Sequence, residues 1–249
     1  MKIDIITLFP EFFNSNIFLG PLKKAVEMKL MEIKVWNLRD FAKHPKEVDD
    51  YPYGGGSGMV LKPEPIFECV DKLKGDKSKI ILFSPQGKIL NQKLVKKLSK
   101  EKHLILICGR YKGVDERVSK IVDLELSIGD YIVSGGEIPA LVLIDAIARL
   151  LPGTVGDKDS VETDSFEDGL LDAPLYTRPY EYKGLKVPKI LLSGNHKKIS
   201  LWKRIQKIRR TLLKRPDLID KAKLTKKERK LVETLKRRLK NESTTNKRN

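Results

Sequence analysis

This chain is organised around two glycine-bearing stretches, Cys108-Gly109-Arg110-Tyr111-Lys112-Gly113 and Ser127-Ile128-Gly129-Asp130-Tyr131-Ile132-Val133-Ser134-Gly135-Gly136-Glu137. Each stretch follows an apolar run, which predicts a turn that leaves a buried strand. Glycine lets the backbone turn sharply and approach a ligand closely, with bare N–H and C=O groups facing it. The two turns therefore predict either a small-molecule site lined by main chain or two structural turns without a ligand.

Strands and helices alternate on both sides of these turns. Apolar runs at 2–8, 31–36, 79–83 and 104–108 predict strands, and the segments between them have helical spacing. This alternation favours an α/β fold whose mainly parallel sheet carries helices on both faces. We expect this domain to span residues 1–160.

A smaller, all-helical domain is expected at 170–249, after an acidic linker at 161–169. Trp202, Ile205, Ile208 and Leu212 recur at helical spacing among basic residues. The spacing of Thr225 and Glu228 is that of a capping box, which predicts the start of another helix.

Charge separates the two predicted domains. Residues 171–249 contain 25 Lys/Arg against 7 Asp/Glu, whereas residues 1–170 contain 25 against 26. A near-neutral body with a cationic arm is typical of a protein that binds a polyanion, and we expect RNA. The alternative is a solvated, lysine-rich surface of the kind that heat-adapted proteins favour.

Composition predicts a cytoplasmic protein that does not enter a membrane. No apolar run approaches the ~18 residues of a membrane span, and Asp4 interrupts the amino-terminal segment, where a signal peptide would be apolar. The two cysteines, Cys69 and Cys108, and three scattered histidines give neither a disulfide framework nor a zinc spacing. We therefore expect no structural metal.

A resemblance to a known family rests on the two turns, on Ser84-Pro85-Gln86-Gly87 before them and on the stretch 149–166 after them. From about Ile5 to about Pro216 the chain resembles the bacterial tRNA (guanine-N1)-methyltransferases of the SPOUT superfamily. The resemblance implies a trefoil knot, an exception to the rule against knotted chains. It also implies methyl transfer from S-adenosylmethionine to the guanosine 3′ of the anticodon (position 37), and an antiparallel homodimer.

Methylation at guanine N1 requires a general base, because the N1 lone pair becomes available only as its proton leaves. The resemblance assigns this role to Asp164 and places an assisting arginine at Arg149, which can hold the carboxylate or the guanine O6. It further implies a set of cofactor-binding residues: Pro85, Gly109, Ile128, Gly129, Asp130, Tyr131, Ile132, Val133, Gly135 and Gly136.

Lys203, Lys207 and Arg210, on the basic helix, are the predicted RNA-binding residues. In the family that the chain resembles, the position of Lys112 usually carries Glu and that of Thr163 carries Glu in some members. Those acids are linked with magnesium dependence in the family, so these two departures argue against a magnesium site. Two other functions remain open: another knotted RNA methyltransferase, for instance one acting on a ribose 2′-hydroxyl, and a non-catalytic RNA-binding protein.

Overall fold

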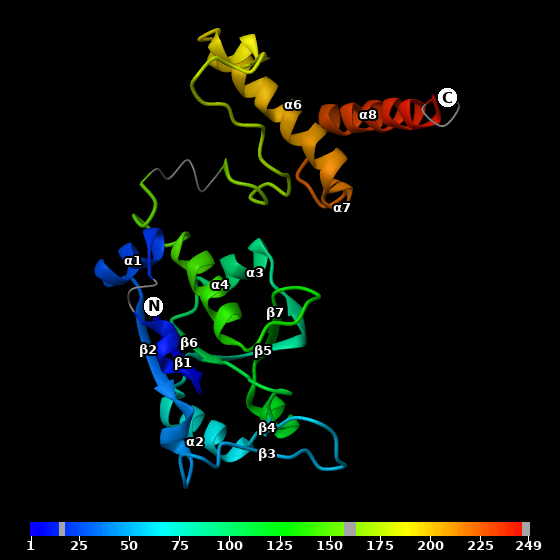
Figure 1. The fold of residues 1–249 in the computed structure, drawn as a ribbon. Helices are drawn as coiled ribbons and strands as arrows, with labels where there is room; N and C mark the ends of the chain where they lie inside the picture. The colour runs from blue at the N-terminus through cyan, green and yellow to red at the C-terminus, as the bar shows by residue number, and fades with distance from the viewer. Residues whose placement is uncertain (15–17, 157–162, 246–249) are drawn as a thin grey trace. The chain divides into compact units, whose positions relative to one another are not determined.

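A computed structural model describes residues 1–14, 18–156 and 163–245, with the backbone alone for 239–245. The chain divides into two units, Met1–Gly156 and Asp157–Asn249, and each is described by itself (Figure 1). The described part of the predicted linker, residues 163–169, belongs to the second unit.

The first unit is built on a parallel sheet of five strands, in the order β2-β1-β6-β5-β7. This confirms the predicted α/β class. The strands are β1 (Lys2–Thr7), β2 (Glu32–Asn37), β5 (Ser78–Ile89), β6 (His103–Ile107) and β7 (Leu124–Ser127). Because all five strands are parallel, the turns that follow them emerge at the same edge of the sheet.

Helices cover both faces of this sheet, as Figure 1 shows. One face packs against α1 (Gly20–Glu27), α3 (Gln92–Leu98) and α4 (Glu137–Ala148). The opposite face packs against α2 (Pro63–Leu73) and the 3-10 helices η3 (Leu38–Phe41) and η4 (Glu116–Ile121). The unit also contains η1 (Pro10–Phe13) and a short hairpin, β3 (Asp49–Asp50) with β4 (Val60–Leu61).

The strand predicted at 79–83 is longer in the structure. β5 continues to Ile89, with a break in register at which both Phe83 and Lys88 pair with Leu126. Gly87 allows the strand to resume, because a Cβ there would lie 2.5 Å from the backbone carbon of Glu125 on β7. The segment 84–87 thus bulges out of the strand instead of ending it.

The second unit is mainly helical. Its helices are η5 (Lys189–Leu192), α6 (His196–Lys214), α7 (Pro216–Ile219) and α8 (Lys226–Thr245). It also contains a two-residue hairpin, β8 (Glu181–Tyr182) with β9 (Leu185–Lys186), which the prediction of an all-helical domain does not include.

The core of the second unit joins α6, α7 and α8. Ile208 and Leu212 of α6 pack with Ile219 and with Val232 of α8. The predicted capping box is confirmed, since Thr225 N donates to Glu228 Oε2 at 2.7 Å and Glu228 N donates to Thr225 Oγ1 at 3.3 Å. Arg204 of α6 also pairs with Glu228, and this hydrogen bond above all lowers the pKa of the Glu228 carboxyl to about 2.

Candidate active site

A cavity of about 400 Å³ lies at the carboxyl edge of the parallel sheet. Its walls are the bulge of β5, the turn after β6 and the turn after β7, together with Pro139 at the start of α4. In open α/β sheets, ligands bind in the crevice outside the carboxyl ends of the strands. The cavity therefore occupies the position expected for a cofactor.

The structure brings nearly all of the predicted cofactor residues to this cavity. Asp130 is exposed and is not among the residues that line it. Those that line it are Pro85, Gly109, Ile128, Gly129, Tyr131, Ile132, Val133, Gly135 and Gly136.

Two glycine-bearing turns approach each other closely on the wall of the cavity. Gly136 N donates to Gly109 O at 2.9 Å, and Arg110 forms an isolated β-bridge with Gly135. A Cβ at Gly136 would lie 2.5 Å from Cys108 Cα. Gly136 is thus required for the fold, because only a residue without a side chain permits this contact.

A buried carboxylate lies behind the turns, at the first residue of α4. Glu137 is 1% exposed, and Thr7 Oγ1 donates to its Oε1 at 2.7 Å. Arg110 Nε donates to the same oxygen at 3.2 Å and lies 3.0 Å from Oε2. The Arg110 guanidinium also lies over the ring of Phe9, 4.5 Å from its centroid. These contacts fix the turn after β6 against β1 and α4.

Sequence reasoning gave no role to Glu137 or Arg110, although both lie within the two quoted stretches. Arg110 lines the cavity, and its Nη1 donates to Ser134 O at 3.3 Å. The sequence signal that could have indicated this ion pair is the presence of two opposite charges, each next to a glycine of a turn that follows an apolar strand.

The two predicted catalytic residues belong to different units, and Arg149 lies away from the cavity of its own unit. Arg149 is exposed and caps the carboxyl end of α4, whereas the cavity lies at the amino end. The 12 residues of α4 span about 18 Å at the helical rise of ~1.5 Å per residue. Asp164 belongs to the second unit, where it is half-buried in the loop that precedes Leu170.

The predicted RNA-binding residues differ in their surroundings. Lys203 is exposed and Arg210 is half-buried. The ammonium group of Lys207 donates to Thr163 O at 2.7 Å, and the side chain is 14% exposed. The three residues lie on α6, a helix whose sequence contains no acidic residue.

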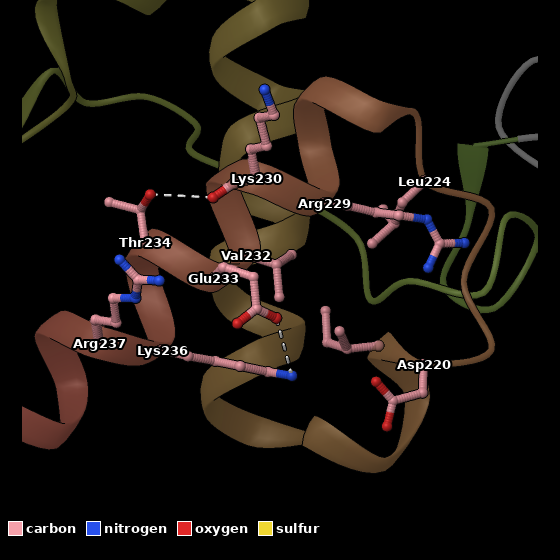
Figure 2. Close-up of a pocket in the computed structure, with 10 residues that line it drawn as sticks. Asp220, Leu224, Arg229, Lys230, Val232, Glu233, Thr234, Lys236 and Arg237 are labelled. Atoms are coloured by element: carbon pink, nitrogen blue, oxygen red, sulfur yellow. Dashed lines mark hydrogen bonds and ion pairs between the residues drawn. The ribbon is translucent and has the colours of Figure 1, made fainter.

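A second cavity, of about 580 Å³, lies between α7 and α8 of the second unit. Figure 2 shows its long charged side chains, with Asp220 and Glu233 among Arg229, Lys230 and Lys236. The Glu233 carboxylate pairs with Lys236 at 3.7 Å. This mixed and mostly basic lining is typical of a surface that contacts a polyanion.

Neither cysteine is suited to nucleophilic chemistry. Burial raises the pKa of the Cys69 thiol to about 12, and it raises that of Cys108 well above its ordinary value. A thiol is nucleophilic only as its thiolate, so both side chains act as small apolar groups.

The described residues contain neither a metal-binding cluster nor a membrane-spanning helix. Among residues 1–14, 18–156 and 163–245, no three His, Cys, Asp or Glu side chains gather where they could hold a metal ion. Within the same ranges, no helix is long and apolar enough to cross a membrane.

Comparison with known proteins identifies the family. The model of the family described as tRNA (Guanine-1)-methyltransferase TrmD matches residues 1–221. A relative from Dictyoglomus turgidum is 55% identical over 244 residues, which cover 97% of this chain and 99% of that protein. One from Thermotoga maritima is 54% identical over 222 residues, 88% of this chain and 90% of its own. One from Staphylococcus epidermidis is 48% identical over 246 residues, 97% of this chain and 100% of its own. All three are named tRNA (guanine-N(1)-)-methyltransferase.

Fold, cavity and relatives together define an S-adenosylmethionine-dependent methyltransferase. The chain belongs to the tRNA (guanine-1)-methyltransferase TrmD family, and membership implies the SPOUT knot.

Gly109 offers the cleanest test of the cavity as the cofactor site. A Cβ there would meet only Val114 Cγ1 at 3.5 Å and Phe83 O at 3.9 Å, which are ordinary contacts, so Gly109→Ala should fold normally. If the cofactor occupies this cavity, the added methyl group would fill space that it needs. We expect S-adenosylmethionine to bind at least about tenfold more weakly, a loss of ~1.4 kcal/mol, by isothermal titration calorimetry.

Gly75→Ala is the matched control. Its added methyl group would meet only Ser78 Oγ at 3.9 Å, an ordinary contact, and Gly75 does not line the cavity, so the affinity should be unchanged. Equal affinities for Gly109→Ala and Gly75→Ala would remove Gly109 from the cofactor site.

Proposed function

We propose that this chain methylates N1 of the guanosine 3′ of the anticodon (position 37) in tRNA, with S-adenosylmethionine as methyl donor. The observation that carries the proposal is the cavity at the carboxyl edge of the sheet, lined by the glycine turns, in a chain of this family. The cysteines and the reducing compartment that they indicate suit an enzyme of the cytoplasm.

The cavity fits a cofactor that is bound largely by main chain. Because Gly109 has no side chain, the space that a Cβ would fill is left for the ligand. Ile132, which is 81% exposed, and Tyr131, which is 57% exposed, offer apolar surface at the rim of the cavity. When bound, S-adenosylmethionine supplies an already activated methyl group on its sulfonium. The protein is then left to remove a proton from guanine and to align the reactants.

Asp164 is the proposed general base. Its carboxylate accepts the proton of guanine N1, and the freed N1 lone pair forms the new bond to the methyl carbon as the carbon–sulfur bond breaks. Arg149 is proposed to assist, because a guanidinium can stabilise negative charge that develops on the guanine ring and its O6.

Asp164→Asn tests the base directly. The substitution keeps the size of the side chain and removes the proton acceptor, at an expected cost of ~10²- to 10⁴-fold in the single-turnover rate. Raising the pH should recover part of this rate, because guanine N1 then loses its proton unaided. The measurement is methyl transfer to an unmodified tRNA transcript, with the methylated atom mapped afterwards.

Asp76→Asn is the matched control, because it makes the same change at an exposed aspartate that does not line the cavity, and it should methylate at the wild-type rate. Asp168 is unsuitable as a control because Arg204 pairs with it. Equal rates for Asp164→Asn and Asp76→Asn would show that Asp164 is not the base.

Within one copy of the first unit, Arg149 and the cavity lie at opposite ends of α4. We therefore propose a homodimer. The apolar helix α4 leaves Ile138 and Val142 more than 40% exposed, and Arg149 continues the same face about two turns after Val142. An apolar helical face of this kind is normally covered. If two α4 helices pack antiparallel about a twofold axis, the Arg149 end of one lies at the cavity end of the other.

Mixed dimers test this sharing of sites. Gly109→Ala impairs cofactor binding and Asp164→Asn impairs the base, so a mixed dimer contains one site in which both functions are intact. Random exchange makes half of the dimers mixed, and each mixed dimer has one intact site out of two. After exchange at limiting cofactor, we therefore expect methylation to rise to about a quarter of the wild-type rate.

The control is a mixture of the same two variants without subunit exchange, and its methylation rate should be the mean of the rates of the two variants measured alone. An exchanged sample that also stays at this mean would place the complete site within one chain.

The tRNA contact is proposed for the basic second unit, with Lys203 and Arg210 of α6 and the cationic rim of the α7–α8 cavity. Residues 171–249 carry a net charge of +18, against −1 for residues 1–170. Contacts to phosphates release bound counterions, so they make the affinity depend on salt.

The slope of log affinity against log salt is negative, and Lys203→Gln should therefore reduce its magnitude by about 0.7 to 0.9, the contribution of a single phosphate contact. The measurement is fluorescence anisotropy of labelled tRNA at several salt concentrations. Lys77→Gln, an exposed lysine of the near-neutral unit, is the control and should leave the slope as it is. If both variants have the wild-type slope, Lys203 does not contact RNA.

A further inference from the structure

The loop that carries Asp164 is bonded at both of its ends to one turn of α6. At one end, Lys207 Nζ donates to Thr163 O at 2.7 Å. At the other end, Leu171 N donates to Thr211 Oγ1 at 2.8 Å. The two helical residues are themselves linked, because Thr211 Oγ1 donates to Lys207 O at 2.7 Å. One helical turn thus fixes the loop on either side of the proposed base.

The ammonium group of Lys207 is directed into this contact. Besides Thr163 O, it lies 3.4 Å from Asp172 Oδ1, and the Lys207 side chain is only 14% exposed. A lysine that binds a phosphate backbone keeps its charge in the solvent at the surface, as exposed Lys203 does. The position of Lys207 therefore differs from that of an RNA-binding lysine.

The loop is also closed by its own hydrogen bonds. Phe166 N donates to Leu170 O at 2.7 Å, and Asp172 N donates to Ser165 Oγ at 2.9 Å. Phe166 has φ of 76°, in the left-handed region that bulky residues rarely adopt. Such a conformation persists only where the surrounding contacts impose it. Asp164 consequently stands between two anchored neighbours, Thr163 and Ser165.

We propose that Lys207 is a positioning residue for methyl transfer: its ammonium group holds the main chain beside Asp164 in place. The proposal rests on the proposed role of Asp164 as general base. A base acts only within hydrogen-bond reach of the proton that it removes, and a misplacement of ~1 Å can cost about 10²-fold in rate. The basic helix α6 then supplies geometry to the reaction in addition to affinity for RNA.

Lys207→Met removes the ammonium group and keeps most of the aliphatic side chain. At saturating tRNA and cofactor we expect its single-turnover rate to fall by about 10²-fold. Lys207→Arg should recover a large part of the rate, because a guanidinium can still donate to the carbonyl oxygen of Thr163. Rates are normalised to the fraction of protein that binds tRNA, so that unfolded protein does not count as lost chemistry.

Lys198→Met is the matched control. Lys198 is an exposed lysine in the first turn of the same helix, and no role is assigned to its side chain. We expect its single-turnover rate to equal that of the wild type. Equal rates for Lys207→Met and Lys198→Met would overturn the proposal. A change confined to tRNA affinity and its salt slope would also overturn it, in favour of direct RNA binding by Lys207.

A double-mutant cycle with Asp164→Asn shows whether Lys207 acts through the base. If it does, adding Lys207→Met lowers the rate of the wild-type protein but not that of the Asp164→Asn variant. Raising the pH then restores part of the rate of each single variant. A full additional loss in the Asp164→Asn background would overturn the positioning role. Asp164→Asn at the wild-type rate would instead overturn the proposed base, so the two failures are distinguishable.

Discussion

The carboxylate of Glu137 is buried where three segments of the first unit meet. It accepts a hydrogen bond from Thr7 at the end of β1 and pairs with Arg110 in the turn after β6, and it belongs to the first turn of α4. An unpaired charge at this depth would be strongly unfavourable, so the arrangement holds only with all three segments in place. The helix N-terminus adds favourable electrostatics for the acid. Gly135 completes the packing, because a Cβ there would lie 2.5 Å from Glu137 Oε2. Contacts within the protein itself therefore hold the cavity wall in place.

The two units differ in the physical means of binding that their surfaces offer. The first unit is near neutral and presents glycine turns, which suits recognition by shape and by main-chain hydrogen bonds at its cavity. The second unit concentrates positive charge on α6 and α8, which suits long-range attraction of a polyanion at high encounter rates. A single mutation can therefore weaken one kind of binding without the other.

Much of this architecture could be predicted from the sequence, because the signals are local. Apolar runs and helical spacing gave the parallel sheet and the helices, and the glycines marked the turns that line the cavity. The side-chain contacts that fix these turns could not be predicted in the same way. Thr7 and Glu137 are 130 residues apart, and Lys207 and Thr163 are 44 apart. Periodicity along the chain carries no information about such pairs. It indicated that Lys207 is a basic residue on a helix, and only the fold shows which carbonyl oxygen it binds.

The bonding of the Asp164 loop to α6 has a consequence for how tRNA can promote its own methylation. Exposed Lys203 lies one turn before Lys207 on the same helix. In the proposed mechanism, a phosphate bound at Lys203 would therefore act on the helix whose Lys207 holds the loop of the base. Binding energy accelerates a reaction only where it stabilises the transition state more than the bound substrate. RNA contacts that order α6 and its loop would do this, since they improve the alignment of the proton acceptor. Correct tRNA would then raise the rate of the chemical step, whereas RNA that binds α6 loosely would occupy the helix without aligning the base.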